Sequence, residues 1–205
     1  MTDPTPGDPM APAPPPTTGW APPPPPPPAG TAGFVYADVP NRAIAYIIDA
    51  IIVGIVVSIV NAILGGAGLA GATVTPGTLN VTINVVGLII SAIIGAAISA
   101  AYFVYTWTSM RATIGMRVLG MQIGNAGDGK TLTMDQAVRR WLAIALPGLL
   151  AQVLFVLPLI GLLIGLVAFG WFIYLVYSTA KSPTKQGFHD VYANTMVVKA
   201  GRIAG

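Results

Sequence analysis

Between residues 42 and 64 the chain is apolar over the length of a helix, with one guanidinium, Arg42, at its start and one carboxylate, Asp49, inside it. A helix of about 20 apolar residues crosses the roughly 30 Å hydrocarbon core of a bilayer. A carboxylate in such a helix costs about 2.5–3.5 kcal/mol at the bilayer centre and less near an interface. The stretch therefore predicts a first membrane span whose carboxylate needs a partner elsewhere in the chain.

The composition places the whole chain among membrane proteins. Apolar residues make up 54% of its 205 residues and charged residues 8%, whereas soluble domains carry about 25% charged residues. So few charged side chains cannot form the solvent-exposed surface of a soluble domain, whereas apolar side chains can face lipid. The sequence contains no cysteine, which excludes disulfides and cysteine-based metal sites.

Three further spans are predicted downstream of the first. Residues 82–108 carry no charge and form the second. Residues 141–178 carry no charge either, and this stretch is too long for one ordinary span. Because Pro158 interrupts a helix, we divide the stretch into spans over about 134–157 and 159–179.

The basic residues indicate how these spans are oriented. They occur at Arg42, in the segment 111–140 and after the last span, whereas residues 65–80 contain none. Lys and Arg accumulate on the cytoplasmic side of membrane proteins. Four spans place all the basic segments on one side, so we expect a multi-pass protein with cytoplasmic N and C termini. The same placement argues against nucleic acid as a partner.

Residues 109–140 form the main polar segment, between the second and third spans. Apolar and polar residues alternate there, and residues 125–129 are turn formers, so we expect a short cytoplasmic amphipathic strand or β-hairpin against the bilayer surface. Thr133 is followed three residues later by Gln136, which is the spacing of a capping box at the start of a helix.

One motif in this segment matches a nucleotide-binding pattern. Residues 124–131 fit the expression of the phosphate-binding P-loop. That loop requires a parallel sheet behind it and a helix that begins at its lysine. A short polar segment between two spans cannot supply such a sheet, so we interpret the motif as a turn.

The N-terminal residues 1–35 are rich in proline and include seven consecutive prolines, Pro22–Pro28. Such a tract favours an extended polyproline II conformation and cannot form a packed core. We expect a disordered tail that is either a solvated spacer or, over residues 12–28, the ligand of a proline-reading partner. Trp20 favours the second interpretation.

Small residues recur at every fourth position of the first two spans. These two stripes are Ala50, Gly54, Ser58 and Ala62 in the first span and Gly87, Ser91, Gly95 and Ser99 in the second. Small side chains let helix backbones approach closely within a membrane. We expect the two stripes to pack against each other, and the alternative is a permeation path lined by their serines.

Four short motifs occur in an order that resembles the RDD family of bacterial membrane proteins, which is named for one arginine and two aspartates. They are Arg42 with Asp49 in the first span, residues 114–123, the pair Arg139 and Arg140, and residues 187–198. The resemblance covers residues 36–200, leaves residues 201–205 as a C-terminal tail, and implies an all-α protein of the bacterial plasma membrane with four transmembrane helices.

By this resemblance Arg42, Asp49 and Asp190 are the naming residues. Arg117 stands where the family often has Lys or Arg in a TPGK stretch, whose proline is replaced here by Ile114. What the family implies about activity is limited, since some members are linked to the transport of ions or small solutes.

The two charges of the first span are too far apart to pair directly. Seven residues separate Arg42 from Asp49, which is about 10 Å along a helix. We hypothesise that Asp49 meets Arg139 or Arg140 at the start of the third helix and that Arg42 meets Asp190. Arg117 is a further possible partner. Such a cluster would fasten the C-terminal segment and the central loop to the first span.

Neither an enzyme nor a cofactor is predicted. His189 is the single histidine, and without cysteine or glutamate around it we expect no metal site and no catalytic dyad. Two functions stay open. One is a structural, accessory or interaction subunit that packs in the lipid bilayer against a membrane-protein partner or a second copy of itself. The other is an ion or small-solute transporter that uses Asp49 as its intramembrane carboxylate.

Overall fold

The computed structural model describes residues 34–74, 76–77, 80–154 and 157–203. Nearly all of the expected proline-rich tail, including the proposed proline-reading ligand at residues 12–28, lies outside the described residues. The described elements are, in chain order, β1 (Phe34–Tyr36), α1 (Val39–Gly66), β2 (Ala72–Val74), β3 (Val81–Ile83), α2 (Val85–Ser109), α3 (Ile114–Val118), β4 (Met121–Asn125), α4 (Met134–Leu154), α5 (Pro158–Lys181), α6 (Phe188–Tyr192) and β5 (Thr195–Ile203).

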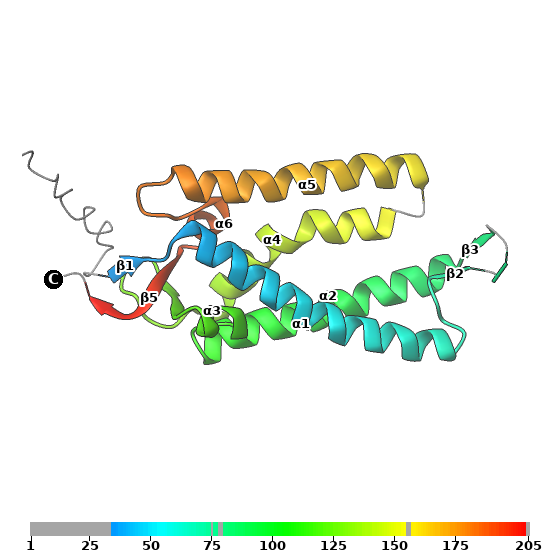
Figure 1. The fold of residues 1–205 in the computed structure, drawn as a ribbon, viewed down its shortest axis with the longest axis horizontal. Helices are drawn as coiled ribbons and strands as arrows, with labels where there is room; N and C mark the ends of the chain where they lie inside the picture. The colour runs from blue at the N-terminus through cyan, green and yellow to red at the C-terminus, as the bar shows by residue number, and fades with distance from the viewer. Residues whose placement is uncertain (1–33, 75, 78–79, 155–156, 204–205) are drawn as a thin grey trace, which may run out of the picture.

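Four of the helices, α1, α2, α4 and α5, are long and apolar enough to cross a membrane. They run lengthwise through the molecule, with the β2–β3 hairpin at one end and β1, β5, α3 and α6 at the other (Figure 1). Each coincides to within a few residues with one of the four predicted spans. The prediction of a four-span helical membrane protein is therefore confirmed.

Local sequence explains where three of these helices begin. The side chain of Asn84 accepts a hydrogen bond of 3.0 Å from the backbone N–H of Gly87 and so caps α2. At α4 the predicted capping box is confirmed, because Thr133 N donates to Gln136 Oε1 at 3.0 Å and Gln136 N donates to Thr133 Oγ1 at 3.3 Å. Pro158 opens α5, where a missing N–H removes no helical hydrogen bond.

A three-stranded antiparallel sheet in the order β1-β5-β4 closes one end of the bundle. The strand predicted in the polar segment is β4, but its partner is β5 from the C-terminal end rather than a neighbouring strand. The short helix α3 precedes it and was not predicted. β1 begins at Phe34, inside the expected tail, and β5 continues to Ile203, inside the expected C-terminal tail.

The P-loop-like motif forms a turn after β4, as predicted. Its backbone donors are already bonded within the chain: Gly127 N donates to Asn125 Oδ1 at 2.8 Å and Lys130 N to Asp128 Oδ1 at 3.0 Å, while Asn125 N, Ala126 N and Gly129 N donate to backbone carbonyls. The next helix begins at Met134 rather than at the lysine, and the sheet behind the loop is antiparallel. None of the features that a phosphate-binding P-loop requires is found here among the described residues.

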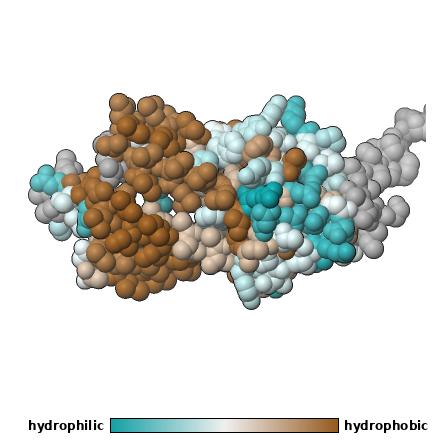
Figure 2. All heavy atoms as spheres, turned by 180° about the vertical axis from the view of Figure 1, so that it is seen from behind, coloured by the Kyte–Doolittle hydropathy of each residue, from teal (hydrophilic) through white to brown (hydrophobic). Residues whose placement is uncertain are grey.

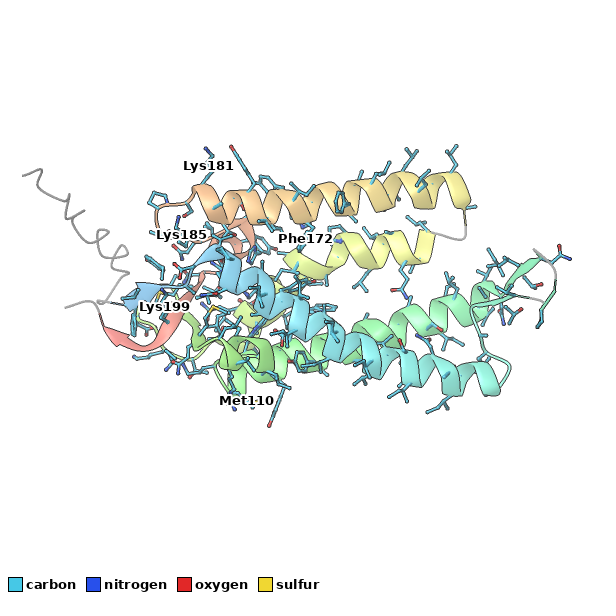
Figure 3. All side chains as sticks on the ribbon, viewed as in Figure 1. Met110, Phe172, Lys181, Lys185 and Lys199 are labelled. Carbon is cyan, nitrogen blue, oxygen red and sulfur yellow. The ribbon has the colours of Figure 1, made fainter. Side chains whose placement is uncertain are left out.

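Buried side chains gather at the sheet end of the molecule. The largest buried apolar cluster there includes Phe103, Trp107, Met116 and Ile123. Figure 2 shows apolar residues covering the helices and polar residues gathered over the sheet end. Lys181, Lys185 and Lys199 also lie at that end (Figure 3). An apolar helical band beside a polar, basic cap is the surface expected of a protein that sits in a bilayer.

The small-residue stripe of α1 does not pack against α2, so that prediction is wrong. Ala50, Gly54, Ser58 and Ala62 are all exposed, and within the described chain no atom lies within 4 Å of the position of a Cβ at Gly54. The reason is the rotation of α1 about its axis. Asp49 is buried and turned towards α2, and Gly54, five residues later, lies about 140° further round the helix.

Candidate functional site

A buried charge cluster joins three helices at the sheet end. Asp190, on α6, is fully buried, and its Oδ2 lies 2.5 Å from Nη2 of Arg42 at the start of α1. Nη1 of Arg140, on α4, donates to the other oxygen of the same carboxylate. The hypothesis that Arg42 meets Asp190 is confirmed, and Asp190 receives a second arginine that we had assigned to Asp49.

The same cluster holds the segment between α5 and β5 in place. The backbone N–H of Gly187 donates to Asp190 Oδ2 at 2.9 Å, which caps α6 with its own aspartate. Arg140 Nη1 also donates to Thr195 Oγ1 at 2.6 Å, at the first residue of β5, and Arg42 Nη1 donates to the carbonyl of Lys185. Two guanidinium groups therefore fasten the C-terminal segment to α1 and α4.

The charges in this cluster determine which groups ionise. Burial would raise the pKa of the Asp190 carboxyl, but the neighbouring charges of Arg140 and Arg42 outweigh burial and hold that pKa well below its usual range. Burial lowers the pKa of His189 from 6.5 to about 3; the Asp190 carboxylate opposes this, and Arg140 and Arg42 add to it. Asp190 is thus a permanent anion, and His189 is neutral at physiological pH.

Asp49 lies apart from this cluster and meets neutral donors. Its side chain is 2% exposed; Oδ1 accepts hydrogen bonds from the Tyr102 hydroxyl at 2.7 Å and from Gly115 N at 2.8 Å, and Oδ2 accepts one from Thr113 Oγ1 at 2.5 Å. Hydrogen bonds to an ionised carboxylate stabilise its charge without a cation. Asp49 therefore joins α1 to α2 and to the start of α3.

The hypothesis that Asp49 meets Arg139 or Arg140 is wrong. Arg140 binds Asp190, while Arg139 makes an exposed pair with Asp135 one turn earlier on α4, with Arg139 Nη2 2.8 Å from Asp135 Oδ2. Arg117, the other partner that we considered, is exposed, and its Nη2 donates to the carbonyl of Met110 at 3.4 Å. Of the three candidate arginines, only Arg140 belongs to the buried site.

Residues 113–116 explain why the chain turns into α3 beneath Asp49. Thr113 Oγ1 accepts a hydrogen bond from Met116 N at 3.2 Å, so this side chain caps α3 while it donates to Asp49. Gly115 passes directly under α1, where a Cβ would overlap the carbonyl oxygen of Ala45. Ile114 N donates to the Tyr102 hydroxyl at 3.2 Å, a bond that a proline at this position could not make.

Tyr102, Thr113 and Gly115 were not predicted as partners of Asp49. Ile114 was noted only for the replacement of a proline, and neither Tyr102 nor Thr113 was singled out as a site residue. Thr113 and Gly115 share one signal: the motif 114–123, through which the chain resembles the RDD family, begins beside Thr113, and Gly115 within it bonds to Asp49.

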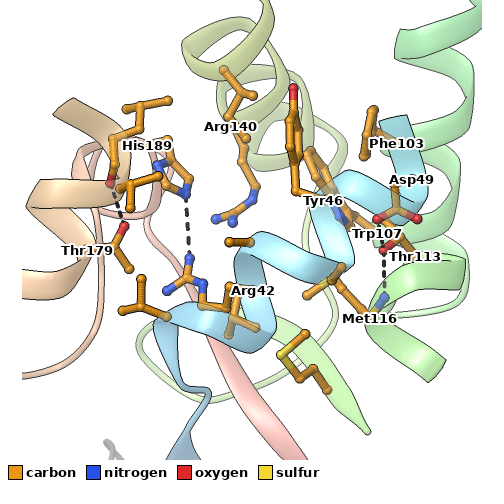
Figure 4. A pocket seen from close by; sticks show the side chains of 18 of the residues that line it. Arg42, Tyr46, Asp49, Phe103, Trp107, Thr113, Met116, Arg140, Thr179 and His189 are labelled. Carbon is orange, nitrogen blue, oxygen red and sulfur yellow. Dashed lines mark hydrogen bonds between the residues drawn. The ribbon is translucent and has the colours of Figure 1, made fainter. Parts of the chain in front are cut away.

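Between Asp49 and the charge cluster lies a cavity of about 110 Å³. Figure 4 shows His189 and Thr179 on one side of it, Asp49 and Thr113 on the other, and Arg42 and Arg140 between them. Most of the remaining wall is apolar and comes from α1, α2 and α5. The cavity thus connects both naming aspartates of the resemblance within one buried site: Asp49 lines it directly, and Asp190 supports the arginines that do.

A model of the RDD family matches residues 36–194, which is most of the chain. The chain belongs to the RDD family. Neither the comparison with curated proteins nor the comparison with solved structures gives a match. In this RDD protein Arg42 and Asp190 form an ion pair, whereas Asp49 is held by hydroxyl and backbone donors.

Proposed function

We propose that this RDD protein is a structural and interaction subunit of a membrane assembly. The observation that carries the proposal is the outward position of the small-residue stripe on α1. Helices associate in lipid through close backbone approach, interhelical hydrogen bonds and packing, and small residues mark the surfaces where this occurs. Because no helix of the described chain covers Gly54, a helix of another chain is the occupant that fits this stripe.

The internal charges support the same proposal. Arg42, Arg140 and Asp190 satisfy one another, and Asp49 accepts three hydrogen bonds from its own chain. Groups bound in this way hold α1, α3, α4 and α6 in a defined arrangement. A rigid arrangement of spans presents a constant outer surface to a partner.

The basic end of the molecule supports an orientation in a bacterial plasma membrane. The sheet end carries Lys181, Lys185 and Lys199 (Figure 3), and α1 and α4 begin there with their arginines. By the positive-inside rule this end faces the cytoplasm, so residue 34 and the C-terminal strand would both lie on the cytoplasmic side.

Single cysteines test the proposal directly, because the chain has none of its own. Gly54→Cys lies 15 residues after the start of α1, and Val167→Cys, on the exposed face of α5, lies 14 residues before the end of that helix, so the two are at matched depth. Oxidative cross-linking in native membranes should join Gly54→Cys to a second polypeptide, which mass spectrometry then identifies as a second copy or a different protein.

Val167→Cys should give no comparable adduct. Equal cross-linking at both positions would mean random encounter, and cross-linking at Val167→Cys alone would place the partner on α5. Either result would contradict the assignment of the interface to the α1 stripe.

A second candidate function is ion or small-solute transport that uses Asp49. One observation favours it, namely that Asp49 lines the cavity as well as joining two helices. An Asp49→Asn variant that accumulates and unfolds like the wild type, but loses cation- or proton-coupled flux in proteoliposomes, would support transport. A variant that fails to accumulate would support the structural role.

A further inference from the structure

Three buried nitrogen atoms, in residues that line the cavity, have no hydrogen-bond partner within the part of the chain that the structure describes. They are Trp107 Nε1, Arg140 Nε and His189 Nδ1, and their residues are 4%, 5% and 9% exposed. Leaving one buried polar group unsatisfied costs about 1–3 kcal/mol. Three such groups around a single cavity indicate that something other than the chain satisfies them.

All three groups are donors. The indole N–H of Trp107 and the Nε–H of Arg140 can only donate. His189 Nε2 lies 3.5 Å from Arg42 Nη2, which can only donate, and 3.5 Å from Asp190 Oδ2, which already accepts from Arg42 and Gly187. The neutral imidazole therefore accepts at Nε2 and carries its proton on Nδ1. The cavity lacks an acceptor.

The cluster beside these donors carries an excess positive charge. Arg42 and Arg140 contribute two positive charges, and Asp190 contributes one negative charge. Asp49, on the other side of the cavity, makes three hydrogen bonds to its own donors. An anionic oxygen near Arg140 would neutralise the cluster and accept the unpartnered hydrogen bonds together.

The rest of the wall is suited to hydrocarbon. Tyr46, Ile144, Phe172 and Leu175 line it, and Phe172 is 41% exposed on the outer surface of α5. The cavity, at about 110 Å³, is smaller than the roughly 150 Å³ cavity that accommodates benzene in another protein. It can enclose a small head group and the first carbons of a chain, while the remainder lies between α1 and α5 towards lipid.

We propose that this cavity binds the anionic head of an amphiphile, a carboxylate or a phosphate, with its oxygens on Trp107, Arg140 and His189 and its hydrocarbon against Tyr46 and Phe172. The head can belong to a free fatty acid or to an anionic phospholipid, which share this chemistry. The proposal is independent of the interaction role of α1, because Gly54 does not line the cavity.

The test uses the full chain purified in a neutral maltoside detergent. Oleate, phosphatidylglycerol and phosphatidylcholine are each titrated, and binding is followed by native mass spectrometry and by the midpoint of thermal unfolding. Trp107→Phe keeps an aromatic ring and removes the N–H donor, so it should weaken binding of the anionic probe about tenfold, as expected for one hydrogen bond to a charged group.

Trp171→Phe is the matched control. Its indole N–H donates to the carbonyl of Ala143 at 2.8 Å, away from the cavity, so this variant should bind as the wild type does. Val176→Phe provides a second variant that fills the cavity and leaves the donors intact, and it too should weaken binding.

Binding of oleate alone identifies a carboxylate as the head, and binding of phosphatidylglycerol identifies a phospholipid; either result supports the proposal. Failure of both anionic probes to bind would overturn the proposal and would mean that water accepts the hydrogen bonds of these donors. Equal binding of phosphatidylcholine, or wild-type binding by both Trp107→Phe and Val176→Phe, would also overturn it.

Discussion

Replacing Asp190 by asparagine should destabilise the protein severely, although the two side chains have almost the same shape. The carboxylate is fully buried and lies between Arg42 and Arg140, whose side chains are 10% and 6% exposed. Asparagine keeps one oxygen to accept a hydrogen bond but removes the charge. Two guanidinium groups would then lie close together in a buried site without a counter-ion.

The magnitude follows from the cost of an uncompensated buried charge. Removing one partner of a buried ion pair destabilises proteins by about 3–5 kcal/mol. For a chain of this size, about 1 kcal/mol corresponds to a change of roughly 2–4 °C in the unfolding midpoint. Asp190→Asn should therefore lower the midpoint by about 6–20 °C.

The assay is thermal unfolding of the detergent-purified protein, with Asp135→Asn as the matched control. Asp135 also pairs with an arginine on α4, but the side chains of Asp135 and Arg139 are 64% and 53% exposed. Exposed pairs of this spacing contribute about 0.3–0.5 kcal/mol, so the control should shift the midpoint by no more than a degree or two.

A second substitution tests the cause of the loss. If the uncompensated charge is responsible, adding Arg42→Gln to Asp190→Asn should recover part of the lost midpoint, because one of the two cations is removed. A midpoint for Asp190→Asn within the range of the Asp135→Asn control would refute the reasoning. So would a double variant that is less stable than Asp190→Asn alone.

Three further predictions concern neighbouring features. The pKa of His189 is about 3 in the folded protein and 6.5 ordinarily, so below about pH 6.5 the unfolded chain takes up a proton that the folded protein does not. The free energy of unfolding should therefore fall by about 2 kcal/mol between pH 7.5 and pH 5. His189→Gln should remove this pH dependence. Gly115→Ala would force a Cβ into the carbonyl of Ala45 and should cost about 1–3 kcal/mol in thermal unfolding. Gly54→Ala has open space inside a helix, where alanine is favoured over glycine by up to about 1 kcal/mol, so it should leave the midpoint unchanged or raise it. Thr133→Ala removes the cap of α4 and should cost about 1 kcal/mol in the same assay; an unchanged midpoint would show that the cap is dispensable.

The spans and the Arg42–Asp190 pair could be predicted because each depends on few properties of the sequence. A run of apolar residues long enough to cross a bilayer is visible locally, and Pro158 divides the last long run where α5 begins. The ion pair followed from the family resemblance and from the sequence-based expectation that both residues lie on the same side of the membrane. A buried charged side chain needs an oppositely charged side chain close to it, and a chain with 8% charged residues offers few candidates.

The partners of Asp49 could not be predicted in the same way. A backbone N–H such as that of Gly115 has no signature in a sequence, and hydroxyl groups are too frequent to single out Tyr102 or Thr113. The arginines were misleading for a related reason. Arg139 and Arg140 are adjacent, but neighbours on a helix point about 100° apart, so only Arg140 faces the interior and only the packed structure identifies it.

Long-range pairing explains the remaining differences. β4 was predicted as a strand, but β5 lies about seventy residues later in the chain, and no local pattern connects the two. The rotation of α1 also depends on distant residues, because Asp49 turns towards Tyr102 and α3. The small residues do share one face of α1, yet the hydrogen bonds of Asp49 go with a rotation of the helix that turns this face away from the rest of the described chain.

The two naming aspartates therefore have different roles that follow from their surroundings. Asp190 neutralises cations from two helices, and its charge is needed wherever both arginines are buried. Asp49 is held by three neutral donors, and in the described chain no arginine or lysine pairs with it. Between them the cavity has unpartnered donors beside the arginines and apolar walls towards α5. Because that electrostatic asymmetry favours an anion beside Arg140, the ligand side of the site is the arginine cluster, and Asp49 serves to hold α1, α2 and α3 around it.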